Sequence, residues 1–220
     1  KFNFIDKKKL ISKVALDLKA GKIVGWFNGK LEFGPRALGS RSILGNPKIK
    51  NMQKKMNLKI KYRESFRPFA PVVLEEKKKE YFNIDINSPY MNFVADVKEN
   101  LKIKKNGKFM NALERVNEVR SIIPAVTHVD YSSRIQTVNE KTNPLFYYLI
   151  KEFEKITGCS VLINTSFNIR GEPIVCSPWD AYRCFMGTNM DILILGSYYL
   201  EKKKQDNRVK YEYTNQFNLD

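Results

Sequence analysis

Six arginines gather in four short segments in which glycine, proline, serine and asparagine favour sharp turns. The segments are EFGPRALGSRS at 32–42, KIKYRESFRPFAP at 59–71, SSRIQTV at 132–138 and NTSFNIRGEPI at 164–174. The other four arginines and the 29 lysines are spread along the chain. Because a guanidinium can form two parallel hydrogen bonds with a phosphate or a carboxylate, these segments predict an anion-binding site.

In the first two segments the basic residues have both a functional and an ordinary interpretation. Gly34 and Pro35 favour a turn that presents Arg36 and neighbouring backbone N–H groups to an anion, although a tight surface loop has the same composition. If residues 59–67 are extended, their odd-numbered positions place four basic residues on one face, Lys59, Lys61, Arg63 and Arg67. An amphipathic edge strand is the alternative for this second segment.

The other two segments place polar side chains on or after predicted strands. SVLI at 160–163 is apolar and is followed by Asn164, Thr165 and Ser166, at the strand end where α/β folds hold ligands. A structural turn is the alternative. Arg134 and Gln136 share one face of a strand, where a lone arginine is also consistent with an ion pair or solvation. His128 is interpreted as a packed, neutral side chain.

Composition indicates a folded domain and narrows the choice of partners. The chain has 220 residues, 43 % of them hydrophobic, and no run of eighteen apolar residues, so no membrane span is expected. A formal charge of +16 is compatible with nucleic acid, but a lysine-rich background explains most of it, and nucleic acid is not the favoured partner. Three cysteines without a metal or redox spacing predict reduced, mostly buried thiols in a cytoplasmic protein.

The order of predicted elements indicates one α/β or α+β domain. Helices are expected over 6–20, 75–81 and 143–158, and further helices should start at 46–47 and at 177–178. Strands are expected over seven ranges, 22–27, 72–74, 90–97, 125–129, 134–138, 160–164 and 192–195. Residues 28–46 resemble a glycine-rich turn region, residues 104–108 a hairpin, and residues 201–220 an extended tail beyond a core over about 22–200.

Together the four segments, with THVD before SRIQTV, resemble the C-terminal part of bacterial carbamoyltransferases of the nodulation and antibiotic O-carbamoyltransferase type. The resemblance covers residues 25–200. It implies a YrdC-like domain, with a twisted mixed sheet and flanking helices around a concave ligand cleft. Because the chain lacks an initiator Met and is poor in histidine, we expect residues 1–220 to be this single domain, without the family's N-terminal actin-like domain that carries iron.

The resemblance also implies an activity. Such a domain uses ATP and carbamoyl phosphate to form carbamoyl adenylate, and the N-terminal domain transfers the carbamoyl group to an acceptor hydroxyl. Mg²⁺ is expected to arrive with the nucleotide, and no metal ligand is assigned in this chain. The partners expected are carbamoyl phosphate, ATP and the N-terminal domain, with a homodimer left open.

Seven residues of this chain match the binding pattern that the resemblance implies. Arg36, Lys61 and Arg67 resemble the phosphate- and carbamoyl-binding cations of catalysis. The remaining four resemble the substrate- and nucleotide-binding groups, namely Arg134, Asn164, Ser166 and Met91. Arg41, Arg63 and Arg170 are expected to hold the surrounding loops in shape. Two other functions stay open for this fold, an RNA-binding module and a threonylcarbamoyl-adenylate-forming enzyme.

Overall fold

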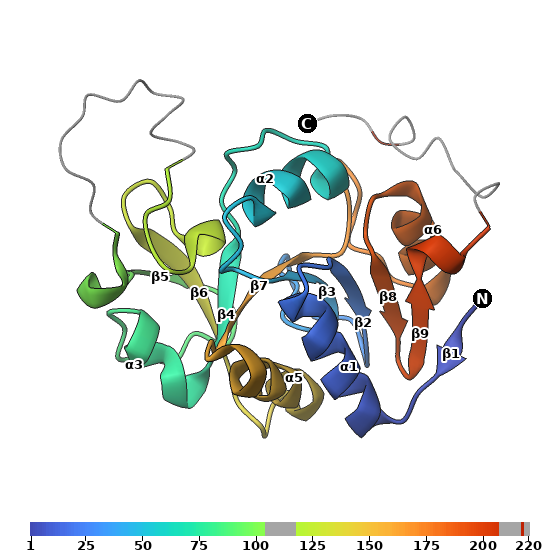
Figure 1. The fold of residues 1–220 in the computed structure, drawn as a ribbon, viewed down its shortest axis with the longest axis horizontal. Helices are drawn as coiled ribbons and strands as arrows, with labels where there is room; N and C mark the ends of the chain where they lie inside the picture. The colour runs from blue at the N-terminus through green and yellow to red at the C-terminus, as the bar shows by residue number, and fades with distance from the viewer. Residues whose placement is uncertain (104–117, 207–216, 218–220) are drawn as a thin grey trace.

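A nine-stranded mixed sheet forms the centre of the computed structural model, which describes residues 1–103, 118–206 and 217 (Figure 1). The strand order is β1-β9-β8-β2-β3-β7-β4-β6-β5. The strands are β1 Asn3–Phe4, β2 Val24–Phe27, β3 Arg41–Gly45, β4 Ala70–Leu74, β5 Phe93–Asp96, β6 Ser132–Val138, β7 Val161–Ser166, β8 Ile192–Leu195 and β9 Tyr198–Glu201. Only the pairs β2–β8 and β4–β6 are parallel, so the predicted twisted mixed sheet is confirmed.

Short helices flank the sheet. They are α1 Lys7–Lys19, α2 Met52–Met56, α3 Lys78–Tyr81, α5 Pro144–Thr157 and α6 Pro178–Gly187. A π-helical turn, Asn57–Lys61, continues α2, and 3₁₀ turns occupy Glu75–Lys77, Glu99–Leu101, Pro124–Val126 and Lys202–Lys204. Helices α1 and α5 lie side by side, and α5 packs against β4 and β7 (Figure 1).

Helix α5 shows how local sequence fixes an element. The Asn143 side chain accepts a hydrogen bond from the N–H of Phe146, and Pro144 occupies the first helical position. Gly158 adopts a left-handed conformation and ends the helix. The buried face of α5 covers the sheet, so this helix is a fixed support beneath the central strands.

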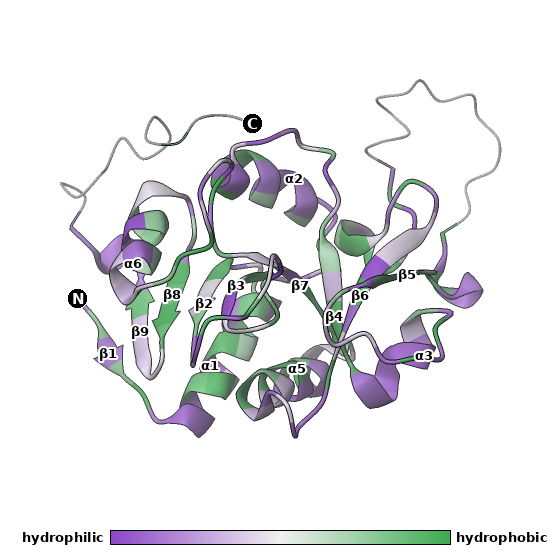
Figure 2. Ribbon diagram, turned by 180° about the vertical axis from the view of Figure 1, so that it is seen from behind, coloured by the Kyte–Doolittle hydropathy of each residue, from purple (hydrophilic) through white to green (hydrophobic). Residues whose placement is uncertain are grey.

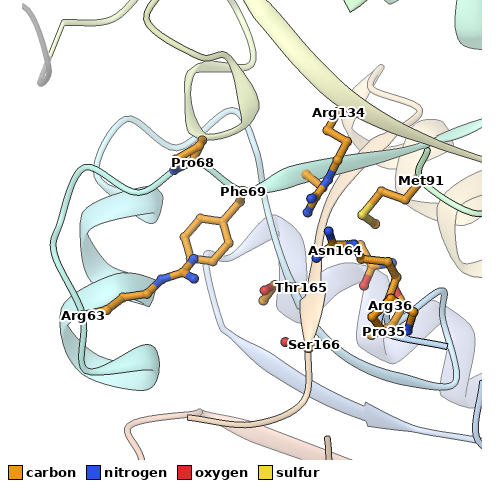
Figure 3. A pocket seen from close by; sticks show the side chains of 12 residues that line it. Pro35, Arg36, Arg63, Pro68, Phe69, Met91, Arg134, Asn164, Thr165 and Ser166 are labelled. Carbon is orange, nitrogen blue, oxygen red and sulfur yellow. The ribbon is translucent and has the colours of Figure 1, made fainter. Parts of the chain in front are cut away.

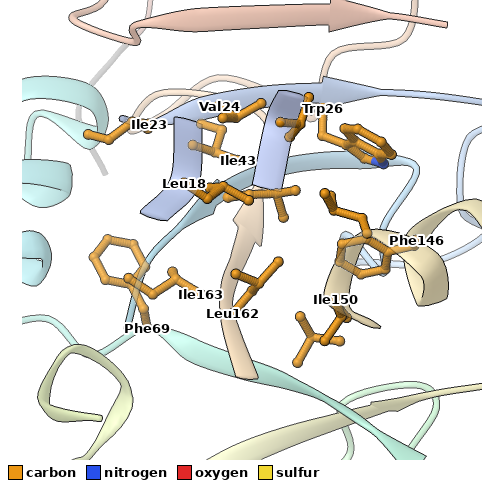
Figure 4. Close-up of a cluster of buried hydrophobic side chains, with 14 of the residues drawn as sticks. Leu18, Ile23, Val24, Trp26, Ile43, Phe69, Phe146, Ile150, Leu162 and Ile163 are labelled. Carbon is orange, nitrogen blue, oxygen red and sulfur yellow. The ribbon is translucent and has the colours of Figure 1, made fainter. Parts of the chain in front are cut away.

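The core lies between the central strands and the helices. Figure 4 shows buried side chains from α1, β2, β3, α5 and β7 meeting in one cluster, each at most 2 % exposed, including Leu18, Trp26, Ile43, Phe146 and Leu162. Strands β2, β3 and β4 are buried at every position, as expected for strands covered on both faces. Figure 2 shows hydrophobic residues along β4 and β8, and hydrophilic residues on α2 and α3.

Three local predictions are wrong. Residues 59–67 are not extended, because the π-helical turn runs to Lys61 and Tyr62 then takes a left-handed conformation with φ 47°. Instead of a strand at 125–129, the chain forms a 3₁₀ turn started by Pro124, whose ring fixes φ and removes an N–H donor. Strand β3, which lies within the glycine-rich stretch, was not predicted. Both of its faces are buried, so its sequence does not alternate between polar and apolar residues.

Most of the other predicted elements are confirmed within the described residues, but the helix expected from 46–47 begins only at Met52. The predicted hairpin at 104–108 lies outside the described residues. The extended tail predicted over 201–220 is wrong at its start, because Glu201 ends β9 and Lys202–Lys204 form a 3₁₀ turn, and the rest from 207 lies outside the described residues apart from residue 217. Across the described part of the chain, no helix is both long and apolar enough to cross a bilayer.

Candidate anion-binding site

Three neighbouring strands place Arg134, Ala70 and Asn164 in one row. Asn164 of β7 pairs with Ala70 of β4, and Val72 of β4 pairs with Gln136 of β6, which puts Arg134 level with Ala70. Residues at the same level of a sheet project from the same face. The two long polar side chains therefore flank a single methyl group, which leaves a hollow between them.

This hollow is part of a cavity of about 130 Å³. Its walls come from the loop between β2 and β3, the segment that leads into β4, the loop before β5, and strands β6 and β7 (Figure 3). The lining residues are Pro35, Arg36, Ala37, Arg63, Pro68, Phe69, Ala70, Met91, Arg134, Asn164, Thr165 and Ser166. Five predicted site residues meet here, namely Arg36, Met91, Arg134, Asn164 and Ser166.

Positive charge accumulates in this cavity without compensation. Among the described residues, no carboxylate forms an ion pair with Arg36 or Arg134. Burial lowers the pKa of Arg134, and the nearby charge of Arg36 lowers it further. Within residues 1–103 and 118–206, the Nε atom of Arg134 is also buried without a hydrogen-bond partner. An anion would relieve both the repulsion and the missing hydrogen bond.

Asn164 adds an acceptor to the same cavity. Its Nδ2 donates to the carbonyl of Ala37 at 3.0 Å and to Oε1 of Gln136 at 2.6 Å. Gln136 donates in turn to the carbonyl of Leu38 at 2.8 Å, so both amides are fixed in orientation. Oδ1 of Asn164 is buried and accepts no hydrogen bond from any described residue. Two residues that line the cavity thus each hold a buried polar atom without a partner among the described residues, a donor on Arg134 and an acceptor on Asn164.

The loop that carries Arg36 is held by a carboxylate and a guanidinium. Oε1 of Glu32 accepts hydrogen bonds from the backbone N–H groups of Leu38, Ser40 and Arg41, at 2.7, 2.7 and 3.3 Å. Arg41 donates to three backbone carbonyls of the same loop and lies over the Phe27 ring at 3.5 Å. The expected loop-holding role of Arg41 is confirmed. Glu32 was missed, although an acidic residue at the start of a glycine-rich loop is a signal for such a contact.

A second hollow of about 420 Å³ adjoins the first and shares Arg63 and Ser166 with it. Lys61 and Arg67 line this second hollow and not the first. The Lys61 ammonium donates to the carbonyls of Ser166 and Asn168 at 2.6 and 3.0 Å, and to their side chains at 3.2 and 2.7 Å. Burial and the charge of Arg63 lower the pKa of Lys61 to about 7. Lys61 therefore ties the turn after β7 to the π-helical turn.

Two arginines of the second segment differ in their surroundings. Arg67 pairs with Glu64 at 2.8 Å and is half-exposed. Arg63 donates to Oδ1 of Asn57 at 2.6 Å and lies over the Phe69 ring at 5.0 Å (Figure 3). Burial and the charge of Arg67 lower the pKa of Arg63 to about 10. Arg63 lines both hollows, so it belongs to the site as well as to the loop framework.

Comparisons with known proteins identify the family and the fold. The family described as Carbamoyltransferase C-terminus matches residues 15–202. An uncharacterized protein of Synechocystis sp., sll1178, is 53 % identical over all of this chain and 36 % of its own length. Nodulation protein NolO of Bradyrhizobium diazoefficiens is 40 % identical over 90 % of this chain and 34 % of its own. The 3'-hydroxymethylcephem-O-carbamoyltransferase of Amycolatopsis lactamdurans is 36 % identical over 72 % of this chain and 26 % of its own.

Two solved structures resemble this chain in fold, at low sequence identity. P. abyssi Sua5 in complex with L-threonine superposes with a TM-score of 0.58 at 16 % sequence identity. The match covers 88 % of this chain and 48 % of the Sua5 chain. Full-length HypF superposes with a TM-score of 0.53 at 19 % sequence identity, and the match covers 84 % of this chain and 20 % of the HypF chain. Both contain YrdC-like domains, so the predicted fold is confirmed. The chain spans about a third of the length of the curated relatives, and it belongs to the carbamoyltransferase family, whose C-terminal region it matches.

Proposed function

We propose that this domain binds carbamoyl phosphate and ATP and forms carbamoyl adenylate. The observation that carries the proposal is the pair of unused groups in the first cavity, the Nε donor of Arg134 and the Oδ1 acceptor of Asn164. Carbamoyl phosphate matches both, because its phosphate accepts hydrogen bonds from arginine and its amide NH₂ donates to a carbonyl oxygen. A ligand without the NH₂ group would leave the Asn164 acceptor buried and unpaired.

The reaction needs positioned charge and no protein nucleophile. Water cleaves carbamoyl phosphate to carbamate and phosphate. A carbamate oxygen then attacks the α-phosphorus of ATP, and the bond to the β-phosphate breaks, so that pyrophosphate leaves and carbamoyl adenylate remains. Arg36 and Arg134 bind phosphoryl oxygens in the first hollow, and Arg67 faces the triphosphate in the second. Ser166, which lines both hollows, lies where the two substrates meet.

Lys61 and Met91 complete the assignment. Lys61 positions Ser166 through two hydrogen bonds and, when a substrate enters, can exchange one of its oxygen partners for a phosphoryl oxygen. Met91 forms an apolar wall of the first cavity, beside the bound substrate. In the described residues, no cluster of three or more His, Cys, Asp or Glu side chains could hold a metal ion. Mg²⁺ is therefore assigned to the ATP phosphates, where it neutralises charge.

The remaining steps are assigned to the larger polypeptide. The relatives are about three times as long as this chain. We assign transfer of the carbamoyl group to an acceptor hydroxyl, and the iron, to an N-terminal actin-like domain of the same polypeptide. A cytoplasmic location, which supplies ATP and carbamoyl phosphate, fits this assignment, and a homodimer is compatible with it.

Carbamoyl phosphate is expected to bind roughly tenfold or more tightly than acetyl phosphate, since only the former donates to Asn164. Isothermal titration of the chain with the two acyl phosphates measures this difference, and inorganic phosphate serves as the control for the anion alone. Equal affinities for the two would show that no protein group recognises the carbamoyl NH₂. Binding of neither would contradict the assignment of the cavity itself.

A further inference from the structure

A separate cavity of about 500 Å³ lies on the other side of Pro68, between α2 and the Pro124–Val126 turn. Its lining residues are Gln53, Phe66, Pro68, Arg120, Thr127, His128, Val129 and Asp130. Of these residues, Pro68 alone also lines the first cavity. The volume is in the range of cavities that bind small organic molecules.

The buried charged group of this cavity is Arg120, which is only 5 % exposed. Its Nη1 donates to the carbonyl of Glu118 at 3.1 Å, whereas Nη2 is buried and has no hydrogen-bond partner in the part of the chain that the structure describes. A buried guanidinium N–H without an acceptor carries an uncompensated desolvation cost. An anionic ligand group beside Nη2 would remove that cost and gain a charge-assisted hydrogen bond.

The walls around Arg120 are largely apolar and are held in place. Phe66 and Val129 are 55 % and 53 % exposed, which leaves their side chains open to a ligand. Beneath them, Thr127 donates to the carbonyl of Ile123 at 3.0 Å and lies 2.7 Å from the Ser121 hydroxyl. A flat, apolar ligand body could therefore pack on preformed walls without a large loss of protein entropy.

The other titratable groups of the cavity do not cancel the charge of Arg120. Asp130 is exposed, and its Oδ1 accepts from the N–H and hydroxyl of Ser132 at 3.0 and 2.7 Å. Water screens this carboxylate more strongly than it screens the buried guanidinium. Burial lowers the pKa of His128, whose Nδ1 lies 3.1 Å from the Ser132 hydroxyl, so the ring is neutral at pH 7. The inner end of the cavity is cationic.

We propose that this cavity is a second ligand site, for a small organic anion with a planar apolar body. The carboxylate or phosphate monoester of the ligand faces Nη2 of Arg120, and its ring packs against Phe66 and Val129. This site uses neither Arg36 nor Arg134, so it is distinct from the carbamoyl phosphate site of the first cavity. Because Phe66 and Pro68 flank Arg67 in the chain, occupancy of this site would also restrain the segment that leads to the second hollow.

Benzoate and its neutral counterpart benzamide test the proposal by saturation-transfer NMR titration of the chain. Benzoate is expected to bind roughly tenfold or more tightly than benzamide. Arg120→Gln should weaken benzoate binding by a similar factor. Phe66→Ser should also weaken it, and this exposed position keeps the test valid if Arg120→Gln does not fold.

Two controls locate the bound benzoate. Phe4→Ser, at another exposed aromatic residue, and Arg134→Gln, in the first cavity, should both leave benzoate affinity unchanged. The proposal is overturned if benzamide binds as tightly as benzoate, or if Phe66→Ser has no effect. It is equally overturned if Arg134→Gln abolishes binding, which would place benzoate in the first cavity, or if benzoate does not bind at all.

Discussion

Replacement of Gly39 by alanine is expected to lower the free energy of unfolding by roughly 3–5 kcal/mol, the largest effect on stability predicted for the site's loop. Gly39 has φ +110°, a conformation that L side chains rarely adopt, and a Cβ atom there would lie 2.2 Å from Cδ1 of Phe146. Phe146 is fully buried beneath this loop and cannot move away without disturbing the core. Backbone strain and overpacking therefore add at one position.

Urea denaturation followed by tryptophan fluorescence measures the effect, because Trp26 donates to the carbonyl of Gly39 at 3.0 Å and reports on the loop. Gly29→Ala is the matched control in the same loop. Its φ of +61° is also left-handed, but a Cβ there meets nothing within 4 Å, so only strain of about 1 kcal/mol is expected. Similar losses in the two variants would contradict the packing of this loop against α5.

Arg134→Gln is expected to weaken carbamoyl phosphate binding on the order of 100-fold without destabilising the free protein. In the free protein, the Arg134 guanidinium is close to Arg36, has a buried donor without a partner, and has its pKa lowered by burial. Replacement by a neutral side chain removes repulsion between like charges. The same replacement removes the main cation that the phosphate would contact, so stability and binding should respond differently.

Isothermal titration and thermal unfolding of the same samples test this separation. Arg183→Gln, on α6 and outside both hollows, is the control and should leave binding unchanged. A large loss of stability in Arg134→Gln would show that Arg134 supports the fold. Unaltered carbamoyl phosphate affinity would show that the ligand does not contact it.

The elements that sequence predicts well are those that local interactions determine. Helix α5 has a capping Asn143, a Pro144 and a terminal Gly158, and α6 has a capping box between Ser177 and Asp180, all of which are visible without tertiary structure. Strand β3 and the π-helical turn depend instead on burial by distant segments. Strand β3 is buried at every position and shows no alternation, whereas residues 57–61 alternate as a strand would, so local sequence predicted neither element.

The site was predictable where chemistry and spacing coincide. Arg36 stands in a loop, whereas Arg134 and Asn164 lie within β6 and β7, and the three meet in one cavity. Ala70 could not be identified in this way, because its contribution is the space left by a small side chain between two strands. The division of the site into two hollows also follows from the unexpected π-helical turn, which directs Lys61 toward Ser166.

Product analysis tests the central claim most directly. The chain would be incubated with ATP, Mg²⁺ and carbamoyl phosphate, and the nucleotides and phosphates would be quantified by mass spectrometry and chromatography. The account predicts carbamoyl adenylate, with pyrophosphate and phosphate released in equal amounts and no product when carbamoyl phosphate is omitted. Conversion of ATP to ADP without pyrophosphate, or binding of both substrates without any adenylate, would contradict it.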